Sequence, residues 1–354
     1  MFGSFSNIDY TNYKNILEYI PNNNDKISNQ LLKYDDILIC FKKYIKENNK
    51  NKYIVSLSGG VDSMVVATIL VYLGCEVIGI HINYNNREES KEEEKFIEDW
   101  CKYNDIKLYV KSINDVTRGS IKRSEYEVYT KKIRFDLYKE VLENENSDEI
   151  LLGHHKDDII ENIIANVCRG RNLLDLAVIK KKYNVNGVTM VRPMIDFYKE
   201  SIYQFAHNNN VPYFKDTTPD WSVRGKYRNN VHNVLQDTFG KNIKDNLISL
   251  SRQSDEWNEL ITKQIIDPFI ESVKHNYDGI NDNISFNVKN YLNYPLCFWN
   301  LVFATLFYKY GKNCPSKKGI ETFMNSIPGN KKVSISDSCI CKIVNNNVLI
   351  TFKT

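Results

Sequence analysis

Residues 52–74, KYIVSLSGGVDSMVVATILVYLG, decide the fold of this chain. Residues 53–57 are apolar and rich in β-branched side chains, which predicts a short buried strand. Residues 64–73 are apolar on nearly every side, which predicts a buried helix. The two glycines between them permit positive φ angles and let the backbone approach a ligand closely. Because the N-terminus of a helix favours anions, we expect this strand-to-helix junction to cradle a phosphate group.

The junction differs from the two best-known phosphate loops. It lacks the lysine of G-x-x-x-x-G-K-[ST], and it does not fit G-x-G-x-x-G. Two glycines alone are also typical of a purely structural turn, but the full string S-G-G-V-D-S is more specific. It resembles the S-G-G-x-D-S pyrophosphate loop of the ATP-pyrophosphatase superfamily, whose members cleave ATP to AMP and pyrophosphate. The resemblance implies an ATP site in which Asp62 helps to hold Mg²⁺ and whose loop consists of Ser58, Gly59, Gly60, Val61, Asp62 and Ser63.

The composition argues against several other classes of protein. The chain has 354 residues, enough for two or three domains, and its net charge of +3 means that contacts with nucleic acid need local clusters of basic residues. Its eight cysteines include no C-x-x-C pair, which argues against a disulfide framework and a zinc or iron–sulfur site. The start lacks the basic and apolar regions of a signal peptide. The uncharged run 290–308 is interrupted by Pro295, so we expect a buried core helix there and no membrane span.

Predicted strands and helices alternate after residue 51, which indicates a parallel sheet covered by helices on both faces. We therefore expect an α/β fold with a Rossmann-like parallel sheet, adenine nucleotide alpha hydrolase-like by the resemblance, followed by a helical region and a small α+β C-terminal domain. Residues 180–186 break the pattern and are expected to form a surface loop. The expected domains are an N-terminal helical extension (1–50), a PP-loop ATP-pyrophosphatase domain (51–225), a helical middle domain (226–280) and a C-terminal α+β domain (281–354).

A second unusual string, GHHKDDIIEN, follows the strand predicted at residues 149–153. Asp157 and Asp158 begin a helix, where carboxylates suit the helix dipole, and Glu161 lies one turn further on. A capped helix with surface acids would explain Asp157 alone, but it explains two histidines beside two aspartates poorly. A zinc site is another alternative, although adjacent histidines lack the usual ligand spacing. Because ligands of such folds bind beyond the carboxyl ends of the strands, we expect this string to lie beside the glycine loop.

Four motifs in the same order narrow the resemblance to the tRNA(Ile)-lysidine synthetase family. Besides S-G-G-V-D-S, they are similar to the family's H-V-N-H-x-L-R segment (from residue 81), its E-x-x-A-R-x-x-R-Y helix (from 127), G-H-H-x-D-D-x-x-E-T (from 153) and R-P-L-x…D-x-S/T-N…R-N (from 192). Four positions depart from these motifs: Tyr84 replaces a histidine, Lys131 an arginine, Asn162 a threonine, and Pro219 the usual neighbour of Thr217. The resemblance extends from about residue 53 to 235.

The resemblance implies the roles of individual residues. The catalytic candidates are Asp62, His154, Asp157, Asp158 and Glu161. His81 is assigned to the adenine end of the ATP site, with an ordinary strand-end histidine as the alternative. The residues assigned to tRNA are Arg87, Lys131, Arg134, Arg192, Asp216, Arg224, Arg228 and Asn229, and the aromatic rings of Trp221 and Tyr227 beside them suit base stacking.

The family's reaction gives these groups a chemical purpose. The wobble cytidine of tRNA(Ile) with a CAU anticodon is flipped into a pocket, and its carbonyl oxygen attacks the α-phosphate of ATP. The ε-amine of free lysine then displaces AMP, giving lysidine. The amine must be neutral to attack, so a nearby group has to take its proton; the candidates are Asp158, Asp157 and His154, in that order.

Alternative functions remain open at this point. They are a PP-loop enzyme that thiolates tRNA bases, an amidating small-molecule ligase, and a catalytically silent tRNA-binding relative. The absent C-x-x-C pairs argue against the thiolase, and the absence of a visible ammonia source argues against the amidating ligase. We further expect a cytoplasmic location, with an organelle as the alternative, no membrane partner, and a homodimer.

Overall fold

The computed structural model describes residues 8–21, 35–116, 120–176, 179–216, 218, 222–277, 279, 281–327 and 329–352. Of the sequence features above, Thr217, Pro219 and Trp221 lie outside these ranges. The chain divides into two compact units, one of Met1–Arg169 and Ala177–Leu250, the other of Gly170–Leu176 and Ser251–Thr354. The expected division into four domains stays a prediction.

The first unit is built on a six-stranded sheet in the order β4-β3-β2-β5-β7-β6. Its strands are β2 (Lys52–Ser56), β3 (Glu76–Asn83), β4 (Lys107–Ser112), β5 (Glu149–Leu151), β6 (Lys182–Val185) and β7 (Val188–Val191). All neighbouring pairs are parallel except β6 and β7. The strand order reverses direction between β2 and β5, which is where open α/β sheets bind their ligands.

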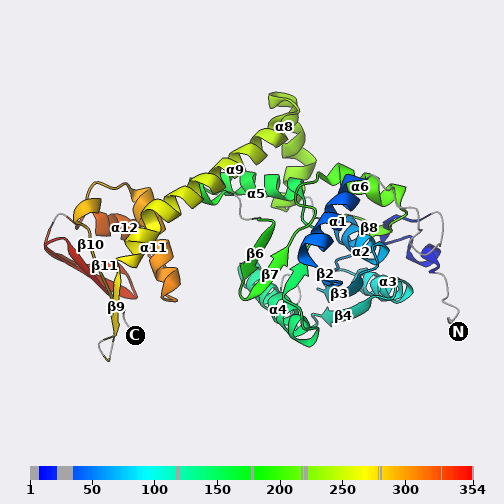
Figure 1. The fold of residues 1–354 in the computed structure, drawn as a ribbon, viewed down its shortest axis with the longest axis horizontal. Coiled ribbons are helices and arrows are strands. Elements are labelled where there is room, and N and C mark those ends of the chain that lie inside the picture. Colours follow the sequence, from blue (N-terminus) through cyan, green and yellow to red (C-terminus); the bar gives the residue numbers. More distant parts are fainter. Residues whose placement is uncertain are drawn as a thin grey trace. The chain divides into compact units, whose positions relative to one another are not determined.

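Helices cover both faces of this sheet (Figure 1). On one face, α1 (Asp36–Asn48), α2 (Val61–Tyr72), α3 (Ser90–Tyr103) and α6 (Lys199–Asn208) share one buried cluster with the strands. On the other face, α4 (Arg123–Asn144) packs against Ile54, Ile78 and Ile150. The strands therefore alternate their side chains between two apolar layers, as buried parallel strands do. The expected α/β fold is confirmed.

The expectation of a surface loop at residues 180–186 is wrong, because β6 occupies most of it. Strands β6 and β7 form a hairpin that closes at Asn186 and Gly187, whose φ angles are 53° and 85°. Asn-Gly is the dipeptide that two-residue hairpin turns favour, because both positions need positive φ. Of the three consecutive lysines, Lys182 lies on this edge strand, where a charged side chain discourages pairing with another chain, and the other two precede it.

The first unit contains further elements outside its six-stranded sheet. The N-terminal part contains the 3-10 helix η1 (Tyr10–Tyr13) and strand β1 (Leu17–Tyr19), which pairs with β8 (Tyr213–Phe214). Helix α5 (Lys156–Cys168) follows β5. After β8, the chain forms α7 (Val223–Lys226), the π-helix η3 (Tyr227–Val231), α8 (His232–Phe239) and α9 (Ile243–Ile261), of which the residues up to Leu250 belong to this unit.

The second unit has a core of its own. It combines an antiparallel sheet, in the order β11-β12-β13-β10-β9, with three α-helices that share its buried cluster (α10, α11 and α12), and thus forms the expected small α+β element. Its elements are η2 (Leu173–Asp175), η4 (Thr262–Ile266), α10 (Asp267–Glu271), β9 (Lys274–Tyr277), β10 (Asp282–Asn287), η5 (Lys289–Tyr291), α11 (Leu296–Lys309), α12 (Lys317–Met324), β11 (Lys331–Ser336), β12 (Cys339–Val344) and β13 (Asn347–Phe352). Helix α11 is the core helix expected within residues 290–308. Across the described ranges, none of the helices has the length and apolar character that crossing a membrane requires.

Trp299 should dominate the stability of the second unit. Its side chain is fully buried and packs at 5.0 Å between ring centroids against both Phe298 and Phe323. We expect Trp299→Ala to lower the free energy of unfolding by about 3–5 kcal/mol, because it leaves a large cavity. Urea unfolding monitored by circular dichroism measures the change. Tyr308→Ala is the matched control, because Tyr308 lies on the same helix and is 89% exposed; equal losses from both changes would contradict this view of the core.

Candidate active site

The glycine loop between β2 and α2 is held in shape by its own hydrogen bonds. The Ser63 hydroxyl accepts a bond from the Ser58 N–H at 3.1 Å and donates one to the Gly60 carbonyl at 3.0 Å. Gly59 has a φ of +83°, which only glycine adopts without strain. Helix α2 begins directly after Gly60, and its first turn contains Asp62. The loop thus presents a helix N-terminus, with its unpaired N–H groups, beyond the end of a parallel strand.

A second glycine brings the segment after β5 against this loop. A Cβ atom on Gly153 would lie 2.7 Å from the Cβ atom of Asp62 and 2.9 Å from the Ser63 nitrogen. No other residue fits there without moving the start of α2. The histidines and carboxylates that follow Gly153 are therefore placed beside Asp62, as the sequence predicts for strand ends at a common edge.

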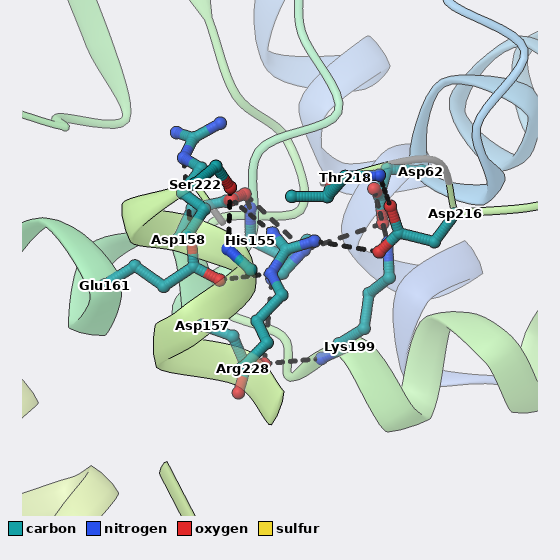
Figure 2. Close-up of polar contacts among 12 residues, drawn as sticks. Asp62, His155, Asp157, Asp158, Glu161, Lys199, Asp216, Thr218, Ser222 and Arg228 are labelled. Carbon is teal, nitrogen blue, oxygen red and sulfur yellow. Dashed lines mark hydrogen bonds and ion pairs between the residues drawn. The ribbon is translucent and has the colours of Figure 1, made fainter. Parts of the chain in front are cut away.

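Charged side chains at this edge form one connected cluster around Asp62 (Figure 2). The Lys199 ammonium group lies 2.6 and 2.8 Å from the two carboxylate oxygens of Asp62. The buried ring of His155 lies 3.7 Å from Asp62, 3.5 Å from Asp158 and 3.6 Å from Asp157. These contacts connect the first turns of α2, α5 and α6.

Asp157 is tied to two other elements. It accepts a hydrogen bond from the Lys199 backbone N–H at 2.8 Å and one from the Lys244 ammonium group at 2.6 Å. Burial opposes its ionisation, but His155, Lys244 and the Lys199 N–H together hold the pKa of Asp157 well below its usual range. Asp157 is therefore a charged group that fixes α6 and the start of α9 to α5.

Arg228 joins three carboxylates on the other side of the cluster. Its guanidinium group donates to Glu161, lies 3.2 Å from Asp216 and lies 3.8 Å from Asp158 (Figure 2). Arg224 lies 3.5 Å from the second oxygen of Glu161. Burial works against the charged form of Arg228, yet the bond to Glu161 and the other carboxylates raise the pKa of Arg228 above its usual value. Removing Arg228 would take away the shortest ion pair of the buried carboxylate of Glu161.

His154 is in a different electrostatic state from the carboxylates. Its Nδ1 atom accepts a hydrogen bond from Arg192 Nε at 3.0 Å. The pKa of His154 is lowered to about 4, chiefly by burial; Asp158 opposes the shift, and the nearby Arg192, Arg224 and His155 contribute to it. At neutral pH the ring is therefore neutral, and because Nδ1 accepts a bond, the proton resides on Nε2.

Two cavities meet at this cluster. The larger, of about 710 Å³, is lined by Ser58, Asp62, Ser63, Lys131, Arg134, His154, Asp158, Arg192, Arg224 and Arg228, together with apolar and aromatic side chains. The smaller, of about 250 Å³, is lined by Ser58, Gly60, Val61, Asp62, Arg87, Lys199, Lys215, Asp216 and Arg228, together with aromatic side chains. Ser58, Asp62 and Arg228 belong to both, so the two spaces adjoin at the glycine loop.

Most of the residues expected at the site lie on these walls, and a few do not. Asp157 and Glu161 contact the cluster through their ion pairs without lining either cavity. Asn229 lies in the π-helix η3 and also lines neither. His81 is buried, its Nδ1 lies 2.9 Å from the Leu57 carbonyl, and it points to the face of β3 opposite to Ile80 and Ile82. Burial lowers the pKa of His81.

Three residues of the cluster were absent from the sequence-based assignment: His155, Lys199 and Lys244. Each contacts Asp62 or Asp157 through a side chain from another part of the chain. His155 was visible as part of the GHHKDD string. No local pattern marks Lys199 or Lys244, because their partners lie 137 and 87 residues away.

Comparison with known proteins shows which proteins this chain is similar to. The family model described as PP-loop domain matches residues 34–236. A tRNA(Ile)-lysidine synthase from Mycoplasmopsis pulmonis is 33% identical over 184 residues, which are 51% of this chain and 62% of that protein. The tRNA(Ile)-lysidine synthases of Chlamydia felis and Enterococcus faecalis are each 28% identical, over 64% of this chain and over 70% and 49% of their own lengths. The chain thus spans about half to two-thirds of these relatives.

A solved structure supports the fold. The U34-tRNA thiolase from Methanococcus maripaludis superposes with a TM-score of 0.50 at 18% sequence identity, over 63% of this chain and 79% of that protein. At this identity the likeness concerns the fold alone. Together with the family model, these findings confirm the resemblance that the sequence motifs indicate.

The depressed pKa of His154 predicts a specific pH dependence of stability. Since the pKa falls from 6.5 to about 4 on folding, the folded state resists protonation, and stability present above pH 6.5 is lost as the pH falls towards 4. At pH 5 the loss from this group should be about 2 kcal/mol. We expect His154→Gln to lose that much less stability than the unmodified chain between pH 7.5 and pH 5, as measured by urea unfolding. Equal losses in both proteins would contradict the buried neutral state.

Proposed function

The chain belongs to the PP-loop domain family, and on that premise we propose that it is an ATP-dependent ligase that adenylates the wobble cytidine of tRNA(Ile) and joins lysine to it, giving lysidine. The observation that carries the proposal is the meeting of the two cavities at Asp62. One is a small space at a helix N-terminus surrounded by cations, which suits pyrophosphate. The other has the size and the mixture of apolar and polar walls of a ligand pocket. The relatives named tRNA(Ile)-lysidine synthase point to the same reaction.

The smaller cavity would hold the pyrophosphate end of ATP. The backbone at Gly60 and Val61 lines it, and the cationic side chains of Arg87, Lys199 and Lys215 surround it. A bound pyrophosphate group would compete with Asp62 for Lys199, because an ammonium ion pairs with either anion. We therefore propose that Lys199 exchanges its bond to Asp62 for one to the phosphate chain when ATP binds.

Asp62 fits the role of a Mg²⁺ ligand. Its carboxylate already holds a cation, the Lys199 ammonium group, and Mg²⁺ sites at nucleotides usually combine one or two protein carboxylates with phosphate oxygens. Mg²⁺ bound there would neutralise charge that develops on the leaving pyrophosphate. The protein groups around it would orient the phosphates through the helix N-terminus and the cations of the smaller cavity.

The acceptor of the lysine proton is proposed to be Asp158. Asp158 lines the larger cavity, whereas Asp157 is occupied by Lys199 and Lys244. Burial raises the pKa of Asp158, but the two neighbouring histidines and the His155 N–H lower it overall, so the carboxylate stays charged and attracts an ammonium group. His154 is a weaker candidate, because its lone pair at Nδ1 is taken by Arg192. We propose that His154 donates from Nε2 to the substrate instead.

The basic side chains of the site fall into two groups, those held by protein groups and those that are more exposed. Arg228 and Arg192 are engaged by protein carboxylates, a ring nitrogen and a carbonyl, so we propose that they hold the wall of the site. Arg224 and Lys131 are more exposed and line the larger cavity, which suits contacts with RNA phosphates.

Four further parts of the proposal remain predictions: free lysine as the nucleophile, the CAU anticodon, the homodimer and the cytoplasmic location.

A labelling assay tests the proposal. The protein is incubated with Mg²⁺, ATP, radiolabelled lysine and an unmodified tRNA(Ile) transcript with a CAU anticodon. We expect ATP-dependent label in the RNA, and at least a hundredfold less with Asp62→Ala, since removal of one group that stabilises developing charge costs about that much. Asp136→Ala, an exposed aspartate of α4, is the matched control and should behave as the unmodified chain.

Other outcomes of this assay discriminate among the alternatives. Release of pyrophosphate without label in the RNA would retain the ATP chemistry and overturn either lysine or this tRNA. The absence of both signals, with tRNA binding intact, would make the chain a silent tRNA-binding relative.

Adjacent lysines on α4 test the RNA-binding part. Lys131 lines the larger cavity, whereas its neighbour Lys132 does not. We expect Lys131→Gln to weaken tRNA binding and to reduce the slope of log affinity against log salt concentration by about one, because one phosphate contact is lost. Lys132→Gln should leave the slope unchanged. Equal slopes for both variants, measured by filter binding from 50 to 200 mM salt, would remove Lys131 from the RNA interface.

A further inference from the structure

The N-terminal strand β1 is built into the nucleotide end of the first unit. It pairs antiparallel with β8 in a two-stranded sheet, with Leu17 opposite Phe214 and Tyr19 opposite Tyr213. The Lys215 N–H donates to the Ile16 carbonyl at 2.9 Å, and its ammonium group donates to the Asn15 carbonyl at 2.8 Å. Strand β8 has only two residues, and a strand this short is not stable by itself, so its pairing with β1 contributes to its position.

On its other side, β8 supports the glycine loop. The Phe214 N–H donates to the Gly59 carbonyl at 2.9 Å. The Phe214 ring lies so close to Gly59 that a Cβ atom there would be 2.0 Å from its Cε2 atom. Phe214 therefore contacts the residue of the loop whose conformation is most demanding. The neighbouring Tyr213 and Lys215 line the smaller cavity.

A chain of aromatic contacts reaches the same ring from the N-terminal segment. Tyr13 packs edge-on against Phe96 at 5.1 Å between ring centroids, and Phe96 packs edge-on against Phe214 at 5.4 Å. Phe96 is fully buried, and the Tyr13 hydroxyl donates to Asp99 on α3. Tyr19 adds a second contact, because its ring stacks at 5.9 Å on Tyr213. The segment thus contacts both residues of β8.

From these contacts we infer that residues 8–21 are a brace that positions the pyrophosphate loop. The brace holds β8, and β8 holds Gly59 in the conformation in which the loop N–H groups converge on the phosphate. This inference rests on the proposed function, because it assigns the brace to ATP affinity. Residues 8–21 are positioning residues: none of them lines either cavity, and they act through Phe214.

Thermodynamic linkage allows two tests of the brace, one of the affinity for ATP and one of the order of residues 8–21. If order in residues 8–21 favours ATP binding, bound ATP must favour order in residues 8–21 by the same factor. A contribution to packing alone would lower the melting temperature without changing the affinity for ATP or the exchange of these amides on ATP binding.

The first experiment measures ATP affinity in variants of the full chain. We expect Tyr13→Ala to raise the Kd for ATP with Mg²⁺ about tenfold, because the contact with Phe96 is lost, and to change kcat of lysine transfer much less than KM for ATP. Tyr13→Phe keeps the ring and should restore the affinity. Val141→Ala is the matched control: it truncates a fully buried side chain of α4 on the opposite face of the sheet. It should lower the melting temperature and leave the Kd unchanged.

The second experiment uses the unmodified chain, in case Tyr13→Ala does not fold. Hydrogen–deuterium exchange of residues 15–19 is compared with and without ATP and Mg²⁺, and slower exchange with ATP is the expected result. If the chain binds ATP but neither this exchange nor the Kd of Tyr13→Ala changes, the brace is refuted and the proposed function stands. If the unmodified chain does not bind ATP, both are refuted.

Discussion

The close approach of three backbone segments at the start of α2 is the constraint on which the rest of the site depends. The loop after β2, the segment after β5 and strand β8 meet within van der Waals distance, and glycine occupies position 59 and position 153 because a Cβ atom at either would overlap a neighbour. Interiors of this density do not accommodate a methyl group without displacement. This packing leaves Gly60, Val61 and Asp62, at the start of α2, on the wall of the smaller cavity.

The structure of the site also depends on a balance between its carboxylates and its cationic side chains. Asp62, Asp157, Asp158, Glu161 and Asp216 converge on a small region, and such a group of carboxylates would repel itself if it were unpaired. Lys199, Lys244 and Arg228 compensate it, each from a different element of the chain. The ion pairs therefore fix the relative positions of α2, α5, α6 and the helices after β8. Burial opposes the ionisation of Asp157, Asp158 and Asp216, but their charged and hydrogen-bonding neighbours lower the pKa of each, so these three carboxylates stay charged.

The sequence predicts the parts of this arrangement that depend on local pattern. The strand, the glycine loop and the helix at residues 52–74 are confirmed, because hydrophobic pattern and glycine conformation are local properties; the strand is displaced by one residue, and the helix begins at Val61, three residues before its predicted start at residue 64. The hairpin at Asn186 and Gly187 carried a local signal too, but three lysines and an asparagine obscured it. Lys199, Lys244 and the pairing of β1 with β8 could not be predicted, because they depend on contacts between residues 87 to about 200 positions apart.

The departures from the family motifs are informative because of where they lie. Tyr84, Lys131 and Asn162, three of the four, all line the larger cavity. Tyr84 accepts hydrogen bonds from Arg134 at 2.8 and 3.2 Å, so it holds the guanidinium group that the motif retains. Lys131 keeps the positive charge of the arginine it replaces, though as a point charge and not as a planar fork. Lys131 and Tyr84 therefore keep cationic side chains at the larger cavity, one by its own charge and the other by orienting Arg134.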